Sequence, residues 1–211
     1  MKLFILLLTF TNIALAATGK IDTLRGDVTI TTNGKTNTAL AGAIVNSGDS
    51  LKTGLKSFAL ITMNDGSVFK LGQKTDLSIP ADNNINLKSG SVFSKISKQK
   101  SNQQFKINTP VAVIGVRGTE FFTSYGQSED KKSDVWTCVN EGSVEVASTK
   151  GKKSVILNPG EGVVVPNGQD VTAPQKYAWT KKLNWNFDPQ KGEVESDVQI
   201  KYENLLKEDY D

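Results

Sequence analysis

The sequence contains no histidine, and this absence excludes several classes of enzyme. Ser-His-Asp and Cys-His catalytic arrangements require an imidazole, as do the metal sites that use histidine ligands. Cys138 is the only cysteine, so neither an internal disulfide nor a cysteine-rich zinc site can form. The stretch SLKTGLKS lacks the spacing of a phosphate-binding loop. We therefore expect a protein that is not an enzyme, with no catalytic residues, no metal and no cofactor.

An excess of charge of one sign is also missing. The chain has 25 basic and 22 acidic residues, a formal net charge of +3, and its lysines are scattered along the sequence. Nucleic-acid-binding proteins usually group their basic residues on one face, so we expect no nucleic-acid partner. The carboxylates of Asp65, Glu129 and Asp130 lie in turns or polar loops, where solvation is the simplest interpretation.

Only the N-terminus carries a long apolar run. Met1 and Lys2 precede LFILLLTFTNIALA, which ends in small residues. This pattern predicts a secretory signal peptide over residues 1–16, with cleavage after Ala16. An uncleaved membrane anchor is the alternative, but a spanning helix needs ~20 mostly apolar residues and polar residues interrupt this run. We expect a mature chain that is periplasmic or secreted, without a membrane span.

Residues 17–172 are predicted to form one all-β domain, a compact irregular roll or sandwich of short strands. Runs such as DVTITT, SFALITM, SVFKL, QFKIN, SVEVAS and GVVVP are rich in β-branched residues and separated by turn residues. Asp65-Gly66 predicts a tight hairpin. A glycine followed two residues later by valine recurs at uneven intervals. This spacing favours a turn that leads into a strand, used several times, over the regular repeat of a solenoid. DVWTCVNEG alternates like a strand with Trp136 and Cys138 on one face, so a buried thiol is favoured over an intermolecular disulfide.

Residues 173–211 differ from the rest, because they combine an aromatic segment with a predicted amphipathic helix. The helical face would carry Val194 and apolar residues at helical spacing after it, with Glu203 and Lys207 as an i,i+4 pair. A short amphipathic helix needs a surface to bury against. The segment is therefore either a lid on the β-domain or a partner-binding element, including a homodimer arm. The candidate partner-binding residues are Tyr177, Trp179, Trp185, Phe187, Val198, Tyr202, Leu205 and Leu206.

The stretch TPVAVIGVRGTEFF, residues 109–122, contains one of only two arginines in the chain. Proline fixes its start, and Val111 to Val116 is expected to be a buried strand with Gly115 allowing close backbone approach. Arginine is preferred where a planar fork must hold a carboxylate or carbonyls, so we expect Arg117 to be an internal clamp, with Glu120 as its nearest candidate partner. The alternative is that Arg117 binds a partner. The motif residues are Thr109, Pro110, Gly115, Val116, Arg117, Gly118, Thr119, Glu120 and Phe121.

This stretch closely resembles the signature of the FecR-domain family, Thr-Pro-x-x-x-x-Gly-Val-Arg-Gly-Thr-Glu/Asp-Phe. GDSLKTG, NDGS and LKSGSVFSKI upstream, and VNEGSVEVAS and LNPGEGVVV downstream, are also similar to the family pattern, in order, over residues ~20 to ~168. The resemblance implies the family's all-β module. Its best-known members resemble a relay in which a cytoplasmic anti-sigma segment and a transmembrane helix precede a periplasmic module that senses a transporter. Here an export signal takes the place of those segments, so iron-transport regulation is not implied.

Two functions remain open. The first is an exported, non-catalytic protein-interaction or sensory module of the cell envelope, with an envelope protein as partner. The second is binding of cell-wall glycan or another surface polymer, with Tyr177, Trp179 and Trp185 stacking on sugar rings. The first is favoured, because the aromatic stretch WTKKLNWNFD offers few polar side chains for a sugar.

Overall fold

The computed structural model of the 211-residue chain describes residues 17–80, 84–97, 104–126, 134–166 and 169–195. Within these ranges the chain forms seventeen β-strands of one connected sheet and two short 3-10 helices. The all-β expectation is confirmed. The predicted C-terminal helix lies, after Glu195, outside the described residues.

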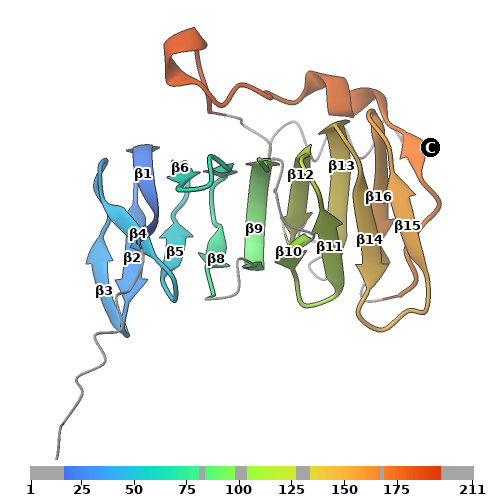
Figure 1. Ribbon diagram of the computed structural model, residues 1–211, viewed down its shortest axis with the longest axis horizontal. Helices are drawn as coiled ribbons and strands as arrows, with labels where there is room; N and C mark the ends of the chain where they lie inside the picture. Colours follow the sequence, from blue (N-terminus) through green and yellow to red (C-terminus); the bar gives the residue numbers. More distant parts are fainter. Residues whose placement is uncertain (1–16, 81–83, 98–103, 127–133, 167–168, 196–211) are drawn as a thin grey trace, which may run out of the picture.

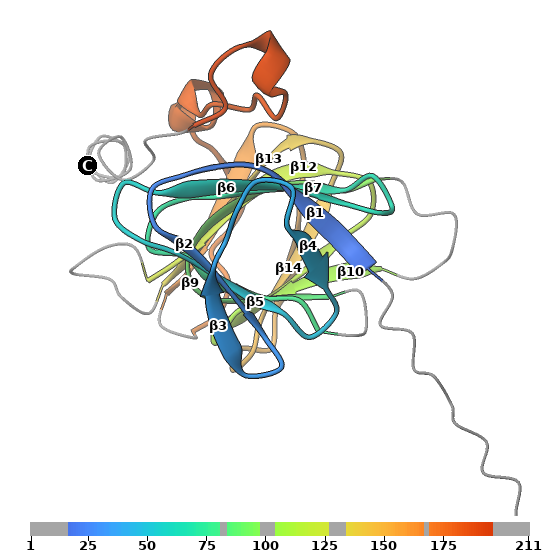
Figure 2. The ribbon, with the colours of Figure 1, turned by 90° about the vertical axis from the view of Figure 1, so that its left-hand side faces the viewer.

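The sheet is folded into two layers. In spatial order, sheet A contains β4 (Ile44–Asn46), β1 (Ala17–Arg25), β6 (Phe58–Met63), β7 (Val68–Leu71), β9 (Ile85–Lys95), β12 (Glu120–Tyr125), β13 (Val135–Glu141), β16 (Glu161–Val165) and β17 (Gln175–Lys176). Sheet B contains β3 (Lys35–Thr38), β2 (Val28–Thr32), β5 (Ser50–Thr53), β8 (Asp76–Ser78), β9 again, β10 (Phe105–Asn108), β11 (Ala112–Val116), β14 (Val144–Ser148) and β15 (Ser154–Leu157). The strands follow one another along the long axis (Figure 1) and surround it in the end-on view (Figure 2).

Strand β9 joins the two layers. Its first half pairs with β8 and, in parallel, with β10 in sheet B, where Ile107 lies opposite Ile85. Its second half pairs with β7 and β12 in sheet A, where Phe93 lies opposite both Lys70 and Phe122. Every other strand pairing is antiparallel. The chain can therefore change layers within one strand.

Gly90 makes this change of layer possible. Its φ of 97° lies in the left-handed region, which side chains other than glycine rarely adopt. A Cβ atom at this position would lie 2.3 Å from the Cα of Thr75, so the backbones approach too closely for any side chain. Thr75 fixes the crossing further, because its Oγ1 accepts from the Ser91 amide at 3.1 Å.

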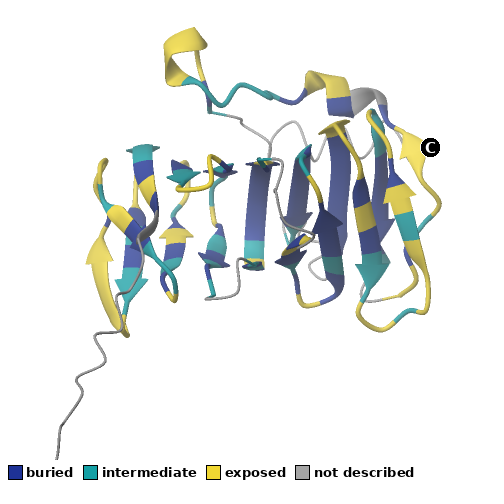
Figure 3. Ribbon diagram, viewed as in Figure 1, coloured by how far each residue is buried: buried dark blue, intermediate teal, exposed yellow. Residues whose placement is uncertain are grey.

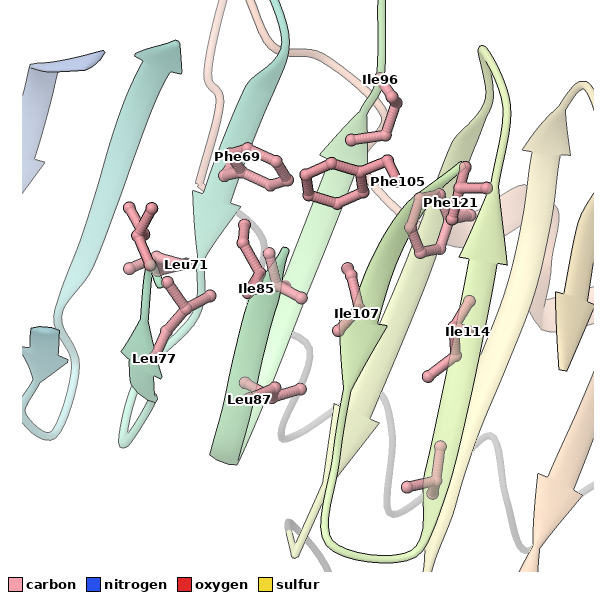
Figure 4. Close-up of a cluster of buried hydrophobic side chains, with 14 of the residues drawn as sticks. Phe69, Leu71, Leu77, Ile85, Leu87, Ile96, Phe105, Ile107, Ile114 and Phe121 are labelled. Carbon is pink, nitrogen blue, oxygen red and sulfur yellow. The ribbon is translucent and has the colours of Figure 1, made fainter. Parts of the chain in front are cut away.

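The core lies between the two layers and follows from the strand alternation. In β10, Phe105 and Ile107 are buried and Lys106 is exposed, as expected of a sheet with one wet face. Side chains from both layers meet in one cluster, which includes Phe69, Leu71, Leu77, Ile85, Leu87, Ile96, Phe105, Ile107, Ile114 and Phe121 (Figure 4). The Phe69 and Phe105 rings stack with their centroids 5.7 Å apart. The edge strand β3 is exposed along its whole length, and the edge strand β15 is partly exposed (Figure 3).

The expected hairpin at Asp65-Gly66 connects β6 and β7. Asp65 accepts from the Ser67 amide at 2.8 Å, and Gly66 has a φ of 83°. This aspartate therefore serves as a turn residue.

Candidate functional site

Residues 173–195 form a strap that crosses the outer face of sheet A. The strap begins at β17, which pairs with β16, and continues through the 3-10 helices η2 (Ala178–Lys182) and η3 (Pro189–Lys191). In Figures 1 and 2 it lies along one side of the roll, above the strands of sheet A. Its far end reaches β1, where Glu195 forms an ion pair with Arg25.

A row of outward-facing side chains lies beneath the strap. Lys70 of β7, Phe93 of β9, Phe122 of β12 and Cys138 of β13 are successive partners across four neighbouring strands. On a sheet face open to water such positions are usually polar. Here Phe93, Phe122 and Cys138 belong to a second hydrophobic cluster, separate from the core between the layers. Its buried members are Phe93, Phe122, Trp136, Cys138, Val164, Tyr177 and Leu183.

The aromatic side chains of the strap complete this cluster. Tyr177 is 8% exposed and Leu183 is 7% exposed, while Trp185 and Phe187 pack against the cluster from its edge. The Trp185 ring meets the Phe93 ring edge-on at 5.3 Å, and its Nε1 donates to the carbonyl of Thr180 at 2.9 Å. Of the two roles expected for the segment, a lid on the β-domain is therefore the one these residues have.

The candidate partner-binding residues thus separate into three groups. Tyr177, Trp185 and Phe187 contact the chain's own sheet, so part of their apolar surface is used within the chain, and their contact with a partner stays a prediction. The backbone of Trp179 lies in η2, and its side chain is not described. Val198, Tyr202, Leu205 and Leu206 lie outside the described residues, whereas Val194, which begins the predicted helical face, is buried.

Gly162 shows how the sheet accommodates the strap. A Cβ atom there would lie 3.0 Å from Cδ2 of Tyr177 and 3.1 Å from Cβ of Cys138. Any side chain would occupy part of the space that the tyrosine ring fills. The glycine of EGVVV, noted in the sequence only as part of a recurring phrase, therefore provides room for the strap.

Lys70 is the unexpected residue of this site. It is 2% exposed, and its Nζ donates to the carbonyls of Asn184 at 2.6 Å and Asn186 at 3.1 Å. The same ammonium lies 4.3 Å from the centroid of the Phe93 ring and 5.2 Å from that of Phe187. These are distances at which an aromatic ring attracts a cation. Lys70 therefore holds the strap through backbone carbonyls and rings.

The environment of Lys70 disfavours its charge. Removal from water lowers the pKa of Lys70 from 10.5 to about 7. Among the ion pairs of the described residues, none provides a carboxylate for this ammonium. Nothing in the sequence around Lys70 distinguishes it from the other lysines, because the residues that cover it come from the strap.

A pocket opens beside Lys70, between the strap and the strands β1, β6 and β7. Its volume is about 280 Å³. Arg25, Lys56 and Lys70 contribute basic groups to its lining, and Phe58 and Phe93 contribute apolar surface. Glu193 and Glu195 enter from the strap. The pocket thus combines a cationic side with an apolar wall.

Thr109 and Pro110 of the 109–121 stretch lie in the turn between β10 and β11 of sheet B. The Thr109 hydroxyl accepts from the Ala112 amide at 2.9 Å and donates to the Ala112 carbonyl at 2.9 Å. Pro110 is exposed, and its carbonyl accepts from the Thr149 hydroxyl. The strand that follows, β11, buries Ile114 and Val116 between the layers as expected.

The chain leaves sheet B for sheet A in the corner 116–120. Gly118 lies against the turn between β13 and β14, since a Cβ at Gly142 would lie 2.8 Å from the Gly118 carbonyl oxygen. The Thr119 hydroxyl donates to the carbonyl of Ser143 at 2.9 Å. Phe121 then enters the core. In this structure these residues join the two layers.

The expected clamp role of Arg117 is wrong. Arg117 is exposed, and none of the hydrogen bonds or ion pairs of the described residues involves its side chain. Glu120 instead accepts from Lys95 Nζ at 2.5 Å and from Asn140 Nδ2 at 3.1 Å. Arg117 lies in the bend before Gly118. Glu120 begins β12, where it pairs with Lys95 of β9 and bonds to that lysine. The alternative role, contact with a partner, remains open for Arg117.

Cys138 is a free, fully buried thiol in the second cluster. Burial raises its pKa well above the ordinary range for cysteine, so the reactive thiolate is suppressed. An inert core thiol is the interpretation that agrees with this position.

The described part of the chain contains no group of three or more side chains that could hold a metal ion. None of its helices has both the length and the hydropathy needed to cross a bilayer. Glu129 and Asp130 lie outside the described residues.

Comparison with known proteins confirms the resemblance inferred from the arginine stretch. Residues 49–145 match the family model described as FecR protein. This range includes the 109–122 stretch and Lys70, whereas the strap lies beyond it. None of the curated proteins matches the sequence.

Two crystal structures of a protein described as an anti-sigma factor, from Parabacteroides distasonis, are similar to this chain. The first is 21% identical, with a TM-score of 0.52, and the second is 19% identical, with a TM-score of 0.51. Each alignment covers 60% of this chain and 59% of the other, so this chain spans about three fifths of the length of these neighbours. At this identity the likeness shows a shared fold.

Proposed function

Residues 49–145 form a FecR domain, and from this premise we propose that the chain is an exported, non-catalytic protein-interaction module of the cell envelope. The family match is the observation that carries the proposal. The anti-sigma description of the structural neighbours is consistent with a regulatory role for proteins of this fold. The proposal includes cleavage of the predicted signal peptide after Ala16, with mature protein in the periplasm or outside the cell.

We infer that the contact with an envelope protein includes the corner that carries Arg117. This guanidinium is exposed and makes no contact that holds the fold together among the described residues. Arginine is enriched in protein interfaces, where its planar fork binds carboxylates and carbonyls. The Glu120 carboxylate beside it already accepts from Lys95 and Asn140, so it does not occupy the donors of the arginine.

Photo-crosslinking in intact cells tests the proposal. A photo-reactive residue at position 117 of the exported full chain is expected to give a discrete, protease-sensitive adduct. The matched control places the same group at Lys35, an exposed position on the edge strand β3. Equal labelling from both positions, or labelling from neither, would contradict a specific protein contact at Arg117. The mass of the recovered chain, expected to begin at Ala17, tests export in the same experiment.

Glycan binding is the weaker candidate. Tyr177 and Trp185, two of the three rings expected to stack on sugars, pack on the second hydrophobic cluster. Sedimentation with purified peptidoglycan separates the two functions: retention of the full chain on the polymer would favour glycan binding, and the proposal expects none.

A further inference from the structure

The pocket beside Lys70 has an unbalanced set of charges. Three basic side chains line it, Arg25, Lys56 and Lys70, against two acidic ones, Glu193 and Glu195. Arg25 is paired with Glu195. Lys70 has only neutral partners, namely two carbonyls and two rings. A buried ammonium without a counter-ion is unfavourable, so an anion that entered this pocket would relieve that state.

The walls of the pocket restrict the class of anion. Phe58 and Phe93 present apolar surface to the same space that the basic groups face. Ligand sites typically combine a largely apolar lining with a few polar groups that fix orientation. A small inorganic ion would leave this apolar surface in contact with water, whereas an organic acid would cover it.

The chain itself shows which anionic group the pocket accepts. Glu195, at the end of the strap, places its carboxylate on the Arg25 guanidinium within the pocket lining. Arg25 is otherwise an exposed residue at the end of β1, so the strap brings the carboxylate to it across the sheet. A ligand carboxylate would compete with Glu195 for this guanidinium.

We propose that this pocket binds a small organic carboxylate, with its charged end between Arg25 and Lys70 and its apolar body against Phe58 and Phe93. Binding displaces Glu195 from Arg25 and so changes the attachment of the strap's end. This ligand site goes beyond the proposed protein-interaction function, and it lies on sheet A and the strap rather than at the Arg117 corner.

Proton linkage follows from the position of Lys70. Arg25 from β1, Lys56 from the turn before β6, and Glu193 and Glu195 from the strap are the other charged groups of the pocket. A bound anion favours the ammonium form of Lys70, so it raises the pKa of this residue from about 7. Binding near neutral pH therefore takes up protons, and affinity falls as the pH rises above 7.

Calorimetric titration of the full chain at pH 7 tests the site with matched probes. Benzoate is compared with benzamide, and N-acetylphenylalanine with its amide, so that each acid has a neutral counterpart of nearly the same shape. Both acids are expected to bind and neither amide. Tighter binding of N-acetylphenylalanine would identify the carboxyl end of a peptide as the ligand source, and tighter binding of benzoate a free acid. Inorganic phosphate is expected to bind more weakly than either acid.

Three variants decide between this site and a purely structural cluster. Arg25→Gln is expected to weaken benzoate binding about tenfold, the loss typical of a charged hydrogen bond. Glu195→Gln removes the carboxylate that competes for Arg25 and is expected to strengthen benzoate binding while Lys70 stays in place. Lys88→Met, an exposed lysine on the sheet B half of β9, is the control and should bind as the wild type does.

Several results would overturn the proposal. They are the absence of binding heat at millimolar acid, equal binding of acids and amides, an Arg25→Gln variant with wild-type affinity, and a Glu195→Gln variant with weaker affinity. The Lys70 Cε resonance provides an independent measurement. Its titration midpoint should move to higher pH when benzoate is added, and an unchanged midpoint would also contradict the site.

Discussion

Arg117 illustrates how much a single side chain's role depends on its surroundings. A glycine-flanked arginine in an apolar run suggests an internal clamp, yet the side chain is exposed and Glu120 has other partners. Arg117→Lys and Arg117→Ala are therefore expected to change the free energy of unfolding by no more than about 0.5 kcal/mol, as is usual for surface positions. Thermal or denaturant unfolding measures this directly. A loss of several kcal/mol in either variant would instead support a structural clamp role for Arg117.

Lys70 gives a prediction for the pH dependence of stability. Its pKa is 10.5 when exposed to water and about 7 in the folded chain, so between these values the unfolded state binds more protons than the folded state. The free energy of unfolding should therefore rise with pH through this window, by up to about 1.4 kcal/mol per pH unit. Below pH 7 the full penalty of burying the ammonium is present.

Substitution isolates this contribution. Lys70→Met should remove the rise between pH 7 and 9, whatever its effect on absolute stability, because methionine does not titrate. Lys88→Met, at an exposed position, should leave the pH profile of the wild type unchanged. Denaturant unfolding at several pH values measures all three proteins. Identical slopes for the wild type and Lys70→Met would show that the lysine retains an ordinary pKa in the fold.

At the scale of elements, strand β9 depends on one glycine. Gly90→Ala is expected to lower the free energy of unfolding by more than about 2 kcal/mol, since it adds a Cβ atom 2.3 Å from Thr75 to a strained backbone. Gly34→Ala is the matched control. Gly34 also has a positive φ, of 78°, but no atom lies within 4 Å of the added Cβ, so only the backbone penalty of about 1 kcal/mol should appear. Equal losses would mean that the close approach does not restrict β9.

Most strands could be predicted from sequence, because local alternation and turn residues determine them. DVTITT, SFALITM and QFKIN contain β2, β6 and β10, and Asp65-Gly66 forms the expected hairpin. The crossing at Gly90 could not be predicted in the same way, since it depends on contact with Thr75, which lies just before β8 and is distant in the sequence. Alternation within β7 also carries no information about what covers the outward face of that strand, where Lys70 lies.

For the whole molecule, the relation of the strap to the sheet was the least predictable feature. The aromatic residues of the segment suggested either a lid or a partner-binding element, and sequence could not decide because both require the same apolar surface. The deciding partners, Phe93, Phe122 and Trp136, are separated from the strap by up to about half the chain and converge only through sheet pairing. The strap thereby turns the outer face of a sheet into a second hydrophobic cluster.

Removal of the strap tests this arrangement. A chain that ends at Ala173 loses Tyr177 and Leu183, and each fully buried large side chain contributes about 1.5–3 kcal/mol. We expect the shortened protein to keep the circular dichroism of a β-protein, to melt at a lower temperature, and to bind hydrophobic dyes through the uncovered Phe93, Phe122 and Trp136. A contiguous exposed apolar patch also favours self-association, which light scattering would detect.

A second shortened chain provides the control. Ending at Glu195 removes only residues 196–211 and leaves the strap and its ion pair with Arg25 intact. The drop in melting temperature should be larger for the chain ending at Ala173, because only that chain uncovers the second cluster. If the two chains melt alike and neither binds the dye, the strap does not stabilise the sheet. In that case its contacts with Lys70 would be too weak to hold it closed in solution.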